Sequence, residues 1–241
     1  MRILYQLTSP MDRTMGTGEI ARRRSVLQGA ASHGTEVACW PVADGPASIE
    51  GAADAALVVP EMLRLVPRWE QEGFDAVVVG CFSDPGLDAL RERAGIPILG
   101  PGAASLHLAA QHGTRISILS PSGRSPGRVA ARLRALGLAD LFASVRGVGA
   151  TVMDLAEQRP GAFGRIVEAG RRCLDQDGAD VIVLGCMSMA FLPGVAHDLQ
   201  TELGCPVVNP VLAGLKTAET TVALGLGATV RRAAPRAEAA E

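Results

Sequence analysis

Two cysteines occupy equivalent positions in a stretch that this chain contains twice. Residues 73–81 read Gly-Phe-Asp-Ala-Val-Val-Val-Gly-Cys, and residues 178–186 read Gly-Ala-Asp-Val-Ile-Val-Leu-Gly-Cys. Cys81 and Cys186 lie 105 residues apart, and each follows an acidic residue, four apolar residues and a glycine. Such a run is typical of a buried parallel strand, so we expect each thiol at the carboxyl end of its strand.

Two matched thiols allow a chemistry that a single thiol does not. One can take a proton from a carbon while the other gives a proton to the opposite face of that carbon. The thiolate is the reactive form, and backbone N–H groups at the start of a helix favour it by lowering the thiol pKa. The remaining cysteines have no partner in the repeat and are predicted to be core residues: Cys39, Cys173 and Cys205. The sequence therefore predicts Cys81 and Cys186 as an acid/base pair.

The similarity between the two stretches continues past the cysteines. Residues 96–101 read Ile-Pro-Ile-Leu-Gly-Pro, and residues 205–210 read Cys-Pro-Val-Val-Asn-Pro. A repeat with such a long period usually means two similar supersecondary units in one fold. We therefore expect the two cysteines to border one crevice between two facing units.

Apolar runs and turn signals predict strands that alternate with helices along the chain. The predicted strands are 2–7, 35–40, 75–80, 97–99, 115–119, 144–148, one from 180, and 206–208. The predicted helices are 18–32, 52–72, 84–94, 102–112, 126–135, 151–158, 162–175, 189–203 and 211–228. Pro60 and Pro67 are expected to break or kink the second helix. In the helix at 84–94, Asp84 is expected to be the N-cap and Pro85 to lie in the first turn.

This alternation predicts an α/β fold of two pseudo-symmetric lobes, each a parallel sheet of about four strands flanked by helices. We place the first lobe at residues 1–101 plus 211–228, so that the last helix returns to it. The second lobe covers residues 102–210. Residues 229–241 have no apolar period and are expected to form a flexible tail.

Polar residues follow the first strand and the strand at 115–119. Ligands of open parallel sheets bind beyond the carboxyl ends of the strands, which points to Thr8, Ser9, Ser120 and Ser122 as well as to the cysteines. The serines lack the Gly-x-Ser-x-Gly turn of a serine nucleophile. We therefore expect these hydroxyl groups to bind a substrate rather than to attack it.

Composition excludes several classes of function. The chain has 241 residues and a net charge of −2, and this net charge gives no electrostatic reason to expect binding to nucleic acid. Its apolar runs are too short to cross a membrane, and its start does not read as a signal peptide. Five cysteines without a CxxC motif disfavour a disulfide framework or a zinc site. We therefore expect a cytoplasmic protein with free thiols, a small-molecule substrate and no metal.

No cofactor is expected either. Residues 16–21 read Gly-Thr-Gly-Glu-Ile-Ala, which matches the dinucleotide pattern G-x-G-x-x-A. These glycines come about nine residues after the predicted first strand, whereas the pattern needs them in the tight turn that follows it. No acidic residue ends the second strand, where Trp40 and Pro41 stand.

Three segments resemble the Asp/Glu/hydantoin racemase superfamily, and most closely its hydantoin racemase branch, which includes allantoin racemase-like proteins. Residues 80–92, Gly-Cys-Phe-Ser-Asp-Pro-Gly-Leu-Asp-Ala-Leu-Arg-Glu, are similar to the first cysteine motif of that branch. Residues 185–190, Gly-Cys-Met-Ser-Met-Ala, are similar to the second. Residues 209–219, Asn-Pro-Val-Leu-Ala-Gly-Leu-Lys-Thr-Ala-Glu, are similar to the closing helix. The resemblance covers about residues 1–228.

The resemblance implies a cofactor-independent racemase or epimerase with one site between its lobes, and a homo-oligomer. It assigns the two acid/base roles to Cys81 and Cys186. It also implies that backbone N–H groups after each cysteine hold the substrate carbonyl and its developing enolate charge. Those N–H groups belong to Phe82, Ser83, Met187 and Ser188.

Departures from the family pattern bear on the substrate. The branch usually has an Asn-Pro-Asn-Thr-like segment after its first strand, where this chain has Gln-Leu-Thr-Ser-Pro at residues 6–10. Amino-acid racemases of the superfamily follow their cysteines with Asn-Thr and Thr-His, whereas Phe82-Ser83 and Met187-Ser188 stand here. Free glutamate or aspartate would need more polar partners than these residues offer. A 5-substituted hydantoin or a related ureide such as allantoin is therefore the expected substrate.

Three alternatives stay open at this point. The chain could be an Asp/Glu racemase, or an arylmalonate decarboxylase-like or maleate isomerase-like enzyme on the same scaffold. Decarboxylation in this superfamily needs one cysteine, so the second cysteine favours proton transfer on two faces. The third alternative is a two-lobed protein that only binds a small molecule, but it leaves the matched thiols unexplained.

Overall fold

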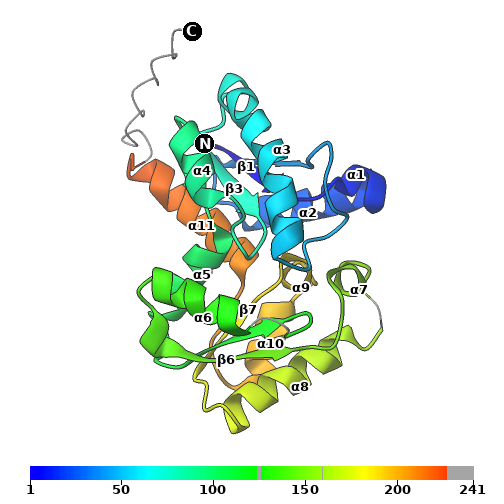
Figure 1. The fold of residues 1–241 in the computed structure, drawn as a ribbon, viewed down its shortest axis with the longest axis vertical. Helices are drawn as coiled ribbons and strands as arrows, with labels where there is room; N and C mark the ends of the chain where they lie inside the picture. Colours follow the sequence, from blue (N-terminus) through cyan, green and yellow to red (C-terminus); the bar gives the residue numbers. More distant parts are fainter. Residues whose placement is uncertain (124–125, 159, 227–241) are drawn as a thin grey trace, which may run out of the picture.

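The computed structural model describes residues 1–123, 126–158 and 160–226, and it contains two parallel sheets of four strands each (Figure 1). The first sheet has the order β2-β1-β3-β4, and the second has the order β6-β5-β7-β8. The strands are β1 (Arg2–Leu7), β2 (Glu36–Trp40), β3 (Ala76–Gly80), β4 (Ile98–Leu99), β5 (Ile116–Ser120), β6 (Phe142–Gly147), β7 (Val181–Leu184) and β8 (Val207–Val208). The predicted fold class is confirmed, since the strand orders of the two sheets correspond one to one.

Helices connect the strands of each sheet and cover their faces (Figure 1). In the first half of the chain they are α1 (Met11–Thr14), α2 (Thr17–Ala30), α3 (Ala52–Gln71), α4 (Leu87–Arg93) and α5 (Pro101–Ala109). In the second half they are α6 (Pro126–Ala135), α7 (Val152–Ala156), α8 (Ala162–Asp175), α9 (Met187–Ala190), α10 (Val195–Leu203) and α11 (Pro210–Ala223). A 3₁₀ turn, Ala139–Leu141, precedes β6.

The repeated apolar run forms β3, in which every residue is buried. Its side chains alternate between two cores because successive residues of a strand point to opposite faces. Val77 and Val79 pack with Met62 and Trp69 of α3. Val78 belongs to a larger core that also contains residues of the second sheet. This shared core holds the two sheets in one body, so the ends of their strands keep a fixed relation.

Asp75 and Asp180 begin the two repeated runs and link neighbouring strands. The backbone N–H of Arg2 donates to Asp75 at 2.7 Å. The backbone N–H groups of Thr114 and Arg115 donate to Asp180 at 2.8 to 3.0 Å. Each of these exposed carboxylates therefore satisfies backbone donors at the start of the central strand beside it.

Several elements differ from the prediction. Helix α3 runs from Ala52 to Gln71 without a break, although Pro60 and Pro67 lie inside it. The short helix α1 lies in a stretch for which no helix was predicted. The predicted helix at 189–203 is two helices, α9 and α10. Helix α4 begins at Leu87 rather than at residue 84.

Helix α11 ends at Ala223, earlier than the predicted end at residue 228, because residues 224–226 form a turn. The predicted tail at 229–241 lies outside the described residues. The helix contacts β1 and β3 of the first sheet. Glu219 on α11 accepts hydrogen bonds from the backbone N–H and the hydroxyl of Ser32, at 2.6 and 2.8 Å. Within the part of the chain that the structure describes, none of the helices is both long enough and apolar enough to cross a membrane.

Candidate active site

A cavity of about 580 Å³ lies where carboxyl ends of strands from both sheets meet. Both cysteines line it, and so does every other residue that the sequence singled out as a substrate ligand. Those residues are Thr8, Ser9, Phe82, Ser83, Ser120, Ser122, Met187 and Ser188. The structure thus brings together side chains from four separate stretches of the chain.

A glycine precedes each cysteine because a neighbouring strand leaves no room for a side chain. A Cβ atom on Gly80 would lie 2.8 Å from the carbonyl oxygen of Gln6. A Cβ atom on Gly185 would lie 2.7 Å from the carbonyl oxygen of Leu119. Both oxygens belong to the backbone of the adjacent central strand and cannot move away cheaply. The repeated Gly-Cys dipeptide therefore reflects the same close approach in both sheets.

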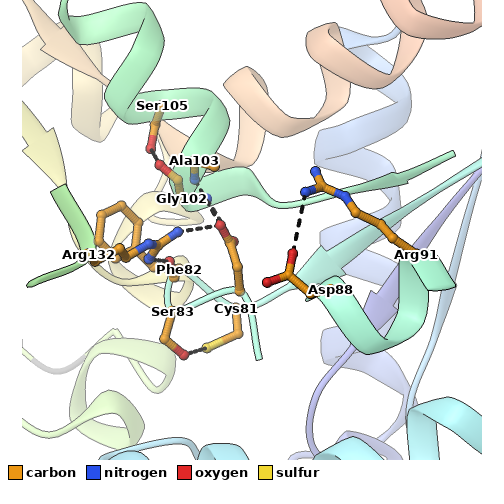
Figure 2. Close-up of polar contacts among 10 residues, drawn as sticks. Cys81, Phe82, Ser83, Asp88, Arg91, Gly102, Ala103, Ser105 and Arg132 are labelled. Atoms are coloured by element: carbon orange, nitrogen blue, oxygen red, sulfur yellow. Dashed lines mark hydrogen bonds and ion pairs between the residues drawn. The ribbon is translucent and has the colours of Figure 1, made fainter. Parts of the chain in front are cut away.

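Cys81 is half-buried and lines the cavity from the end of β3. Its Sγ lies 3.2 Å from the hydroxyl oxygen of Ser83, and Figure 2 shows this contact. The backbone N–H of Asp84 donates to the carbonyl of Cys81 at 3.1 Å, which closes a turn. A turn therefore stands between this thiol and α4, which begins at Leu87.

Cys186 is buried at the end of β7 and is the N-cap residue of α9. Here the expected helix does follow the thiol. Backbone N–H groups of Met189 and Ser188 are hydrogen-bonded to the sulfur atom and act to lower its pKa. The backbone N–H of Ser83 does the same for Cys81. These donors favour the thiolate form of each cysteine.

The pKa of each thiol is nevertheless raised, which contradicts the lowered pKa expected from the sequence. Burial raises the pKa of Cys186 to about 11, against the effect of its two backbone donors. Burial also raises the pKa of Cys81, against the effect of its hydrogen bonds with Ser83. Removing a thiolate from water costs more than these neutral donors return. A negative charge on Cys81 raises the pKa of Cys186 further, so the two thiols interact across the cavity.

Asp84 does not cap the helix that follows it. Its carboxylate accepts hydrogen bonds from the backbone N–H groups of Gly102 and Ala103, at 3.0 and 2.8 Å, and so caps α5. It also forms an ion pair with Arg132 of α6. Figure 2 shows Arg132 between Phe82 and the first turn of α5. Asp84 thus connects the Cys81 turn to two helices distant in sequence.

Three arginines that the sequence analysis did not single out also line the cavity, namely Arg23, Arg128 and Arg132, and two of them have hydrogen bonds to residues next to the cysteines. Arg23 is 3% exposed and donates to both Glu19, at 2.7 Å, and the hydroxyl of Ser188, at 3.3 Å. Arg132 donates to the carbonyl of Phe82. The spacing of Glu19 and Arg23 is that of an i,i+4 ion pair, which could have marked Arg23. Nothing local marks Arg132, because its partners lie about fifty residues away in the chain.

Residues 47–52 and helix α7 complete the wall of the cavity. Its apolar part includes the side chains of Met15, Ile49 and Met153. Its polar part includes the hydroxyl groups named above, the two thiols, and the charged side chains of Glu50, Arg23, Arg128 and Arg132, of which Arg23 and Arg132 are paired with carboxylates. Such a mixture suits a small, largely neutral molecule with a few hydrogen-bonding groups.

The dinucleotide-like segment at 16–21 does not form a phosphate-binding turn. Gly16 is the N-cap residue of α2, and α1 separates it from the end of β1. Over the described ranges 1–123, 126–158 and 160–226, no three His, Cys, Asp or Glu side chains are grouped in a way that could hold a metal ion.

Comparisons with known proteins agree with this arrangement. The family model described as Asp/Glu/Hydantoin racemase matches residues 20–218. A hydantoin racemase of Paenarthrobacter aurescens is 34% identical over 226 residues, which are 93% of this chain and 92% of that protein.

Two solved structures are similar over the whole chain. The allantoin racemase of Klebsiella pneumoniae has a TM-score of 0.87 at 30% identity, covering 100% of this chain and 96% of that one. The allantoin racemase of Pseudomonas fluorescens has a TM-score of 0.87 at 28% identity, covering 100% of both chains. By the match of the family model and this identity to a curated relative, the chain belongs to the Asp/Glu/hydantoin racemase family and is an isomerase.

Proposed function

We propose that this protein racemises a 5-substituted hydantoin or a related ureide such as allantoin, with Cys81 and Cys186 as the two acid/base residues. The observation that carries the proposal is that these two thiols end equivalent strands of two facing sheets and line one cavity. Membership in a racemase family removes the alternative of a protein that only binds a small molecule.

The proposed reaction begins with one cysteine as thiolate and the other as thiol. The thiolate takes the proton from the ring carbon next to the carbonyl, and the electron pair of the broken C–H bond moves onto the carbonyl oxygen as an enolate. The thiol on the other side of the cavity then gives its proton to the opposite face of the same carbon. The products are the other enantiomer and an enzyme in which the two protonation states are exchanged.

The enolate needs donors that are already in place, because a thiolate is otherwise too weak a base for such a carbon. We assign this role to backbone N–H groups of Phe82, Ser83, Met187 and Ser188, as the resemblance implied. Two of them, those of Ser83 and Ser188, contact the sulfur atoms in the structure. In the proposed reaction these two N–H groups first donate to the thiolate, and then also stabilise the negative charge that develops on the enolate oxygen.

Hydroxyl groups at the strand ends are proposed as ligands of the ring nitrogens and carbonyls. Thr8 and Ser9 are buried at the end of β1, and Ser120 ends β5, the corresponding strand of the second sheet. Ser122 lines the cavity two residues further on. Hydroxyls both donate and accept, which suits the alternating N–H and C=O groups of a hydantoin ring.

The ureide substrate is favoured by the relatives and by the apolar wall. The similar proteins carry the names hydantoin racemase and allantoin racemase. Phe82 and Met187 are buried next to the thiols, in positions where a charged amino acid would need polar partners. Two cysteines also favour proton transfer on two faces over a decarboxylation that needs only one.

Other expectations remain part of this proposal. We keep the two lobes at 1–101 plus 211–228 and at 102–210 as the division of the chain. A homo-oligomer and a cytoplasmic location follow from the resemblance and the composition, respectively.

The test is incubation in heavy water with single enantiomers of several 5-substituted hydantoins, allantoin, aspartate, glutamate and an arylmalonate. Proton NMR reports exchange at the stereocentre, optical rotation reports racemisation, and carbon dioxide release reports decarboxylation. We expect exchange and loss of optical rotation with a hydantoin or with allantoin. Cys81→Ser and Cys186→Ser should each lower racemisation by at least about a hundredfold, since a general acid or base contributes on that scale. Full activity of either variant, in a protein with unchanged thermal unfolding, would refute the two-cysteine mechanism.

A further inference from the structure

Arg132 reaches from the second sheet to the turn that holds Cys81. It lies on α6, which packs on β6, whereas Cys81 ends β3 of the first sheet. Its guanidinium donates to the carbonyl of Phe82 and to Asp84, the residues one and three positions after the cysteine. The guanidinium carbon also lies 5.2 Å from the centre of the Phe82 ring (Figure 2). Arg132 therefore contacts the Cys81 turn through three separate groups.

Arg23 makes the corresponding contacts in the opposite direction. It lies on α2, which packs on β2 of the first sheet, whereas Cys186 ends β7 of the second. Its guanidinium donates to the hydroxyl of Ser188, two positions after the cysteine. The guanidinium carbon lies 4.8 Å from the centre of the Phe191 ring, at the C-terminal end of α9. Arg23 thus contacts the Cys186 segment from the other sheet.

The two arginines share several features that make them equivalent. Each lies on a helix that packs on an edge strand of one sheet, and each lines the cavity. Each forms an ion pair with a carboxylate, Glu19 for Arg23 and Asp84 for Arg132. Each has an aromatic ring under its guanidinium, where a cation is favourable. An arginine side chain carries a positive charge in proteins, so the buried Arg23 and the half-buried Arg132 each bring a permanent positive charge to the cavity.

We propose that Arg23 and Arg132 are a crossed pair of positioning residues, each of which stabilises the thiolate at the end of a strand in the other sheet. The inference rests on the two-cysteine function proposed above and adds two residues to it. Neither arginine is assigned a proton-transfer role. Each holds the segment that follows one cysteine and supplies the positive charge that its thiolate needs inside a buried site.

The electrostatics of the two thiols fit this arrangement. Burial raises the pKa of both cysteines, and against it Arg132 lowers the pKa of Cys81 while Arg23 lowers that of Cys186. Other titratable or charged groups also face the thiols or line the same cavity. Asp84 and Tyr5 are near Cys81, and the two cysteines act on each other. Glu19 lies beside Arg23, and Glu50 and Arg128 are in the cavity wall.

Asp84 makes the expected effect of losing Arg132 on Cys81 larger. Its negative charge raises the pKa of Cys81, and Arg132 balances that charge in the structure. Loss of Arg132 would therefore remove a cation and leave a buried anion beside the thiol. The effect on Cys81 should exceed the effect of losing Arg23 on Cys186, because Glu19 is not among the groups that shift the pKa of Cys186 most.

The test measures the reaction of each thiol with iodoacetamide from pH 6.5 to 11, by mass spectrometry of the peptides that contain Cys81 and Cys186. Only the thiolate reacts, so the rate below the pKa reports the fraction ionised. Arg132→Met should slow the alkylation of Cys81 at pH 8 by about tenfold or more, and leave that of Cys186 unchanged or faster. Arg23→Met should slow the alkylation of Cys186 and spare Cys81.

Matched controls come from the same helices. Arg24 is exposed on α2 and Arg134 is exposed on α6, and neither is among the residues that line the cavity. Arg24→Met and Arg134→Met should leave both alkylation profiles unchanged. Arg23→Lys and Arg132→Lys keep the charge and should restore most of the lost reactivity. Thermal unfolding of every variant shows whether the fold is retained.

Three results would overturn the inference. The first is an equal change in the alkylation rates of Cys81 and Cys186 in one variant. The second is an unchanged alkylation profile in a methionine variant that is folded. The third is a lysine variant whose alkylation rates match those of the methionine variant. Alkylation needs no substrate, so this result does not depend on turnover. If the wild-type protein racemises hydantoins but the methionine variants do not each slow the alkylation of the thiol in the other sheet, the arginine pair alone is rejected. If the variants do slow the alkylation of these thiols but the wild-type protein racemises none of the panel, the proposed function alone is rejected.

Discussion

The carboxylate of Glu50 accepts a hydrogen bond from the backbone N–H of Val152 at 2.9 Å, although the two residues lie 102 positions apart. Glu50 belongs to the loop before α3, and Val152 is the first residue of α7. Both line the cavity. The hydroxyl of Ser48 donates to the same carboxylate at 3.1 Å, which orders the loop around it. One hydrogen bond therefore fastens two segments of the cavity rim to each other.

Loss of this contact should weaken substrate binding more than chemistry. Glu50→Ala frees the loop from α7, and a hydrogen bond of this exposed kind contributes about 0.5–1 kcal/mol. We expect KM to rise about two- to fivefold with kcat nearly unchanged, in racemisation assays by polarimetry. Asp44→Ala is the control, because Asp44 lies in the same loop and its carboxylate is bonded to Gly45 and Arg13 instead. An unchanged KM for Glu50→Ala would show that the rim contact has no part in binding.

Activity should rise with pH through the neutral range. Proton transfer requires one thiolate and one thiol, whereas burial raises the pKa of Cys81 above its ordinary value and that of Cys186 to about 11. Near pH 7 most molecules therefore hold two thiols, and each rise in pH increases the singly ionised fraction. We expect kcat/KM to rise up to about tenfold per pH unit between pH 7 and 9, and to fall again near pH 11. Polarimetry, corrected for racemisation without enzyme, measures this profile; a maximum at pH 7 would contradict it.

Gly102 should not tolerate a side chain. A Cβ atom there would collide with the carbonyl oxygen of Phe82 and with the guanidinium of Arg132. Gly102→Ala should displace the Cys81 turn, lower the free energy of unfolding by about 1–3 kcal/mol and reduce kcat. Urea unfolding and polarimetry measure the two effects. Gly127→Ala on α6, where a Cβ meets no atom within 4 Å, is the matched control; it should leave kcat unchanged and raise the free energy of unfolding by about 0.5–1 kcal/mol.

Glu219 should stabilise the fold in a pH-dependent way. Burial acts to raise the pKa of this carboxyl, but hydrogen bonds from Lys216 and Ser32 outweigh it and hold the pKa below its ordinary value of 4.5. Because the folded pKa is lower than the unfolded one, the stabilisation is present above pH 4.5 and is lost as the pH falls through the folded value. Glu219→Gln should lower the free energy of unfolding at pH 7 by about 1–3 kcal/mol. Urea unfolding at pH 7 and pH 3 should show that difference shrinking at the lower pH; a constant difference would contradict the assignment.

Much of the fold could be predicted from the sequence because its signals are local. The apolar runs that end in Gly-Cys predicted β3 and β7, and the bounds of α6 and α8 were predicted to the residue. Signals that depend on packing were less reliable. Proline does not break α3, because the surrounding core holds a helix that its own propensity disfavours.

The site was predictable only in part. The repeat predicted the two cysteines, and position after a strand predicted the hydroxyl groups. All of these residues line the cavity. The partners of Asp84 were not predictable, since an N-cap usually serves the next helix and this one serves α5. The direction of the thiol pKa shifts was also wrong. Helix position is visible in a sequence, whereas the depth at which a sulfur is buried is a property of the whole molecule.

The one-to-one correspondence of the two strand orders has a consequence for handedness. An enantiomer and its mirror image differ in which face of the reacting carbon carries the hydrogen. In the proposed reaction, the two corresponding halves place one thiol on each side of a flat ring, so a ring turned over within the cavity again meets one thiol on each face. A duplicated architecture of this kind has little reason to prefer the left-handed form over the right-handed one, and it suits a reaction whose two end points have equal energy.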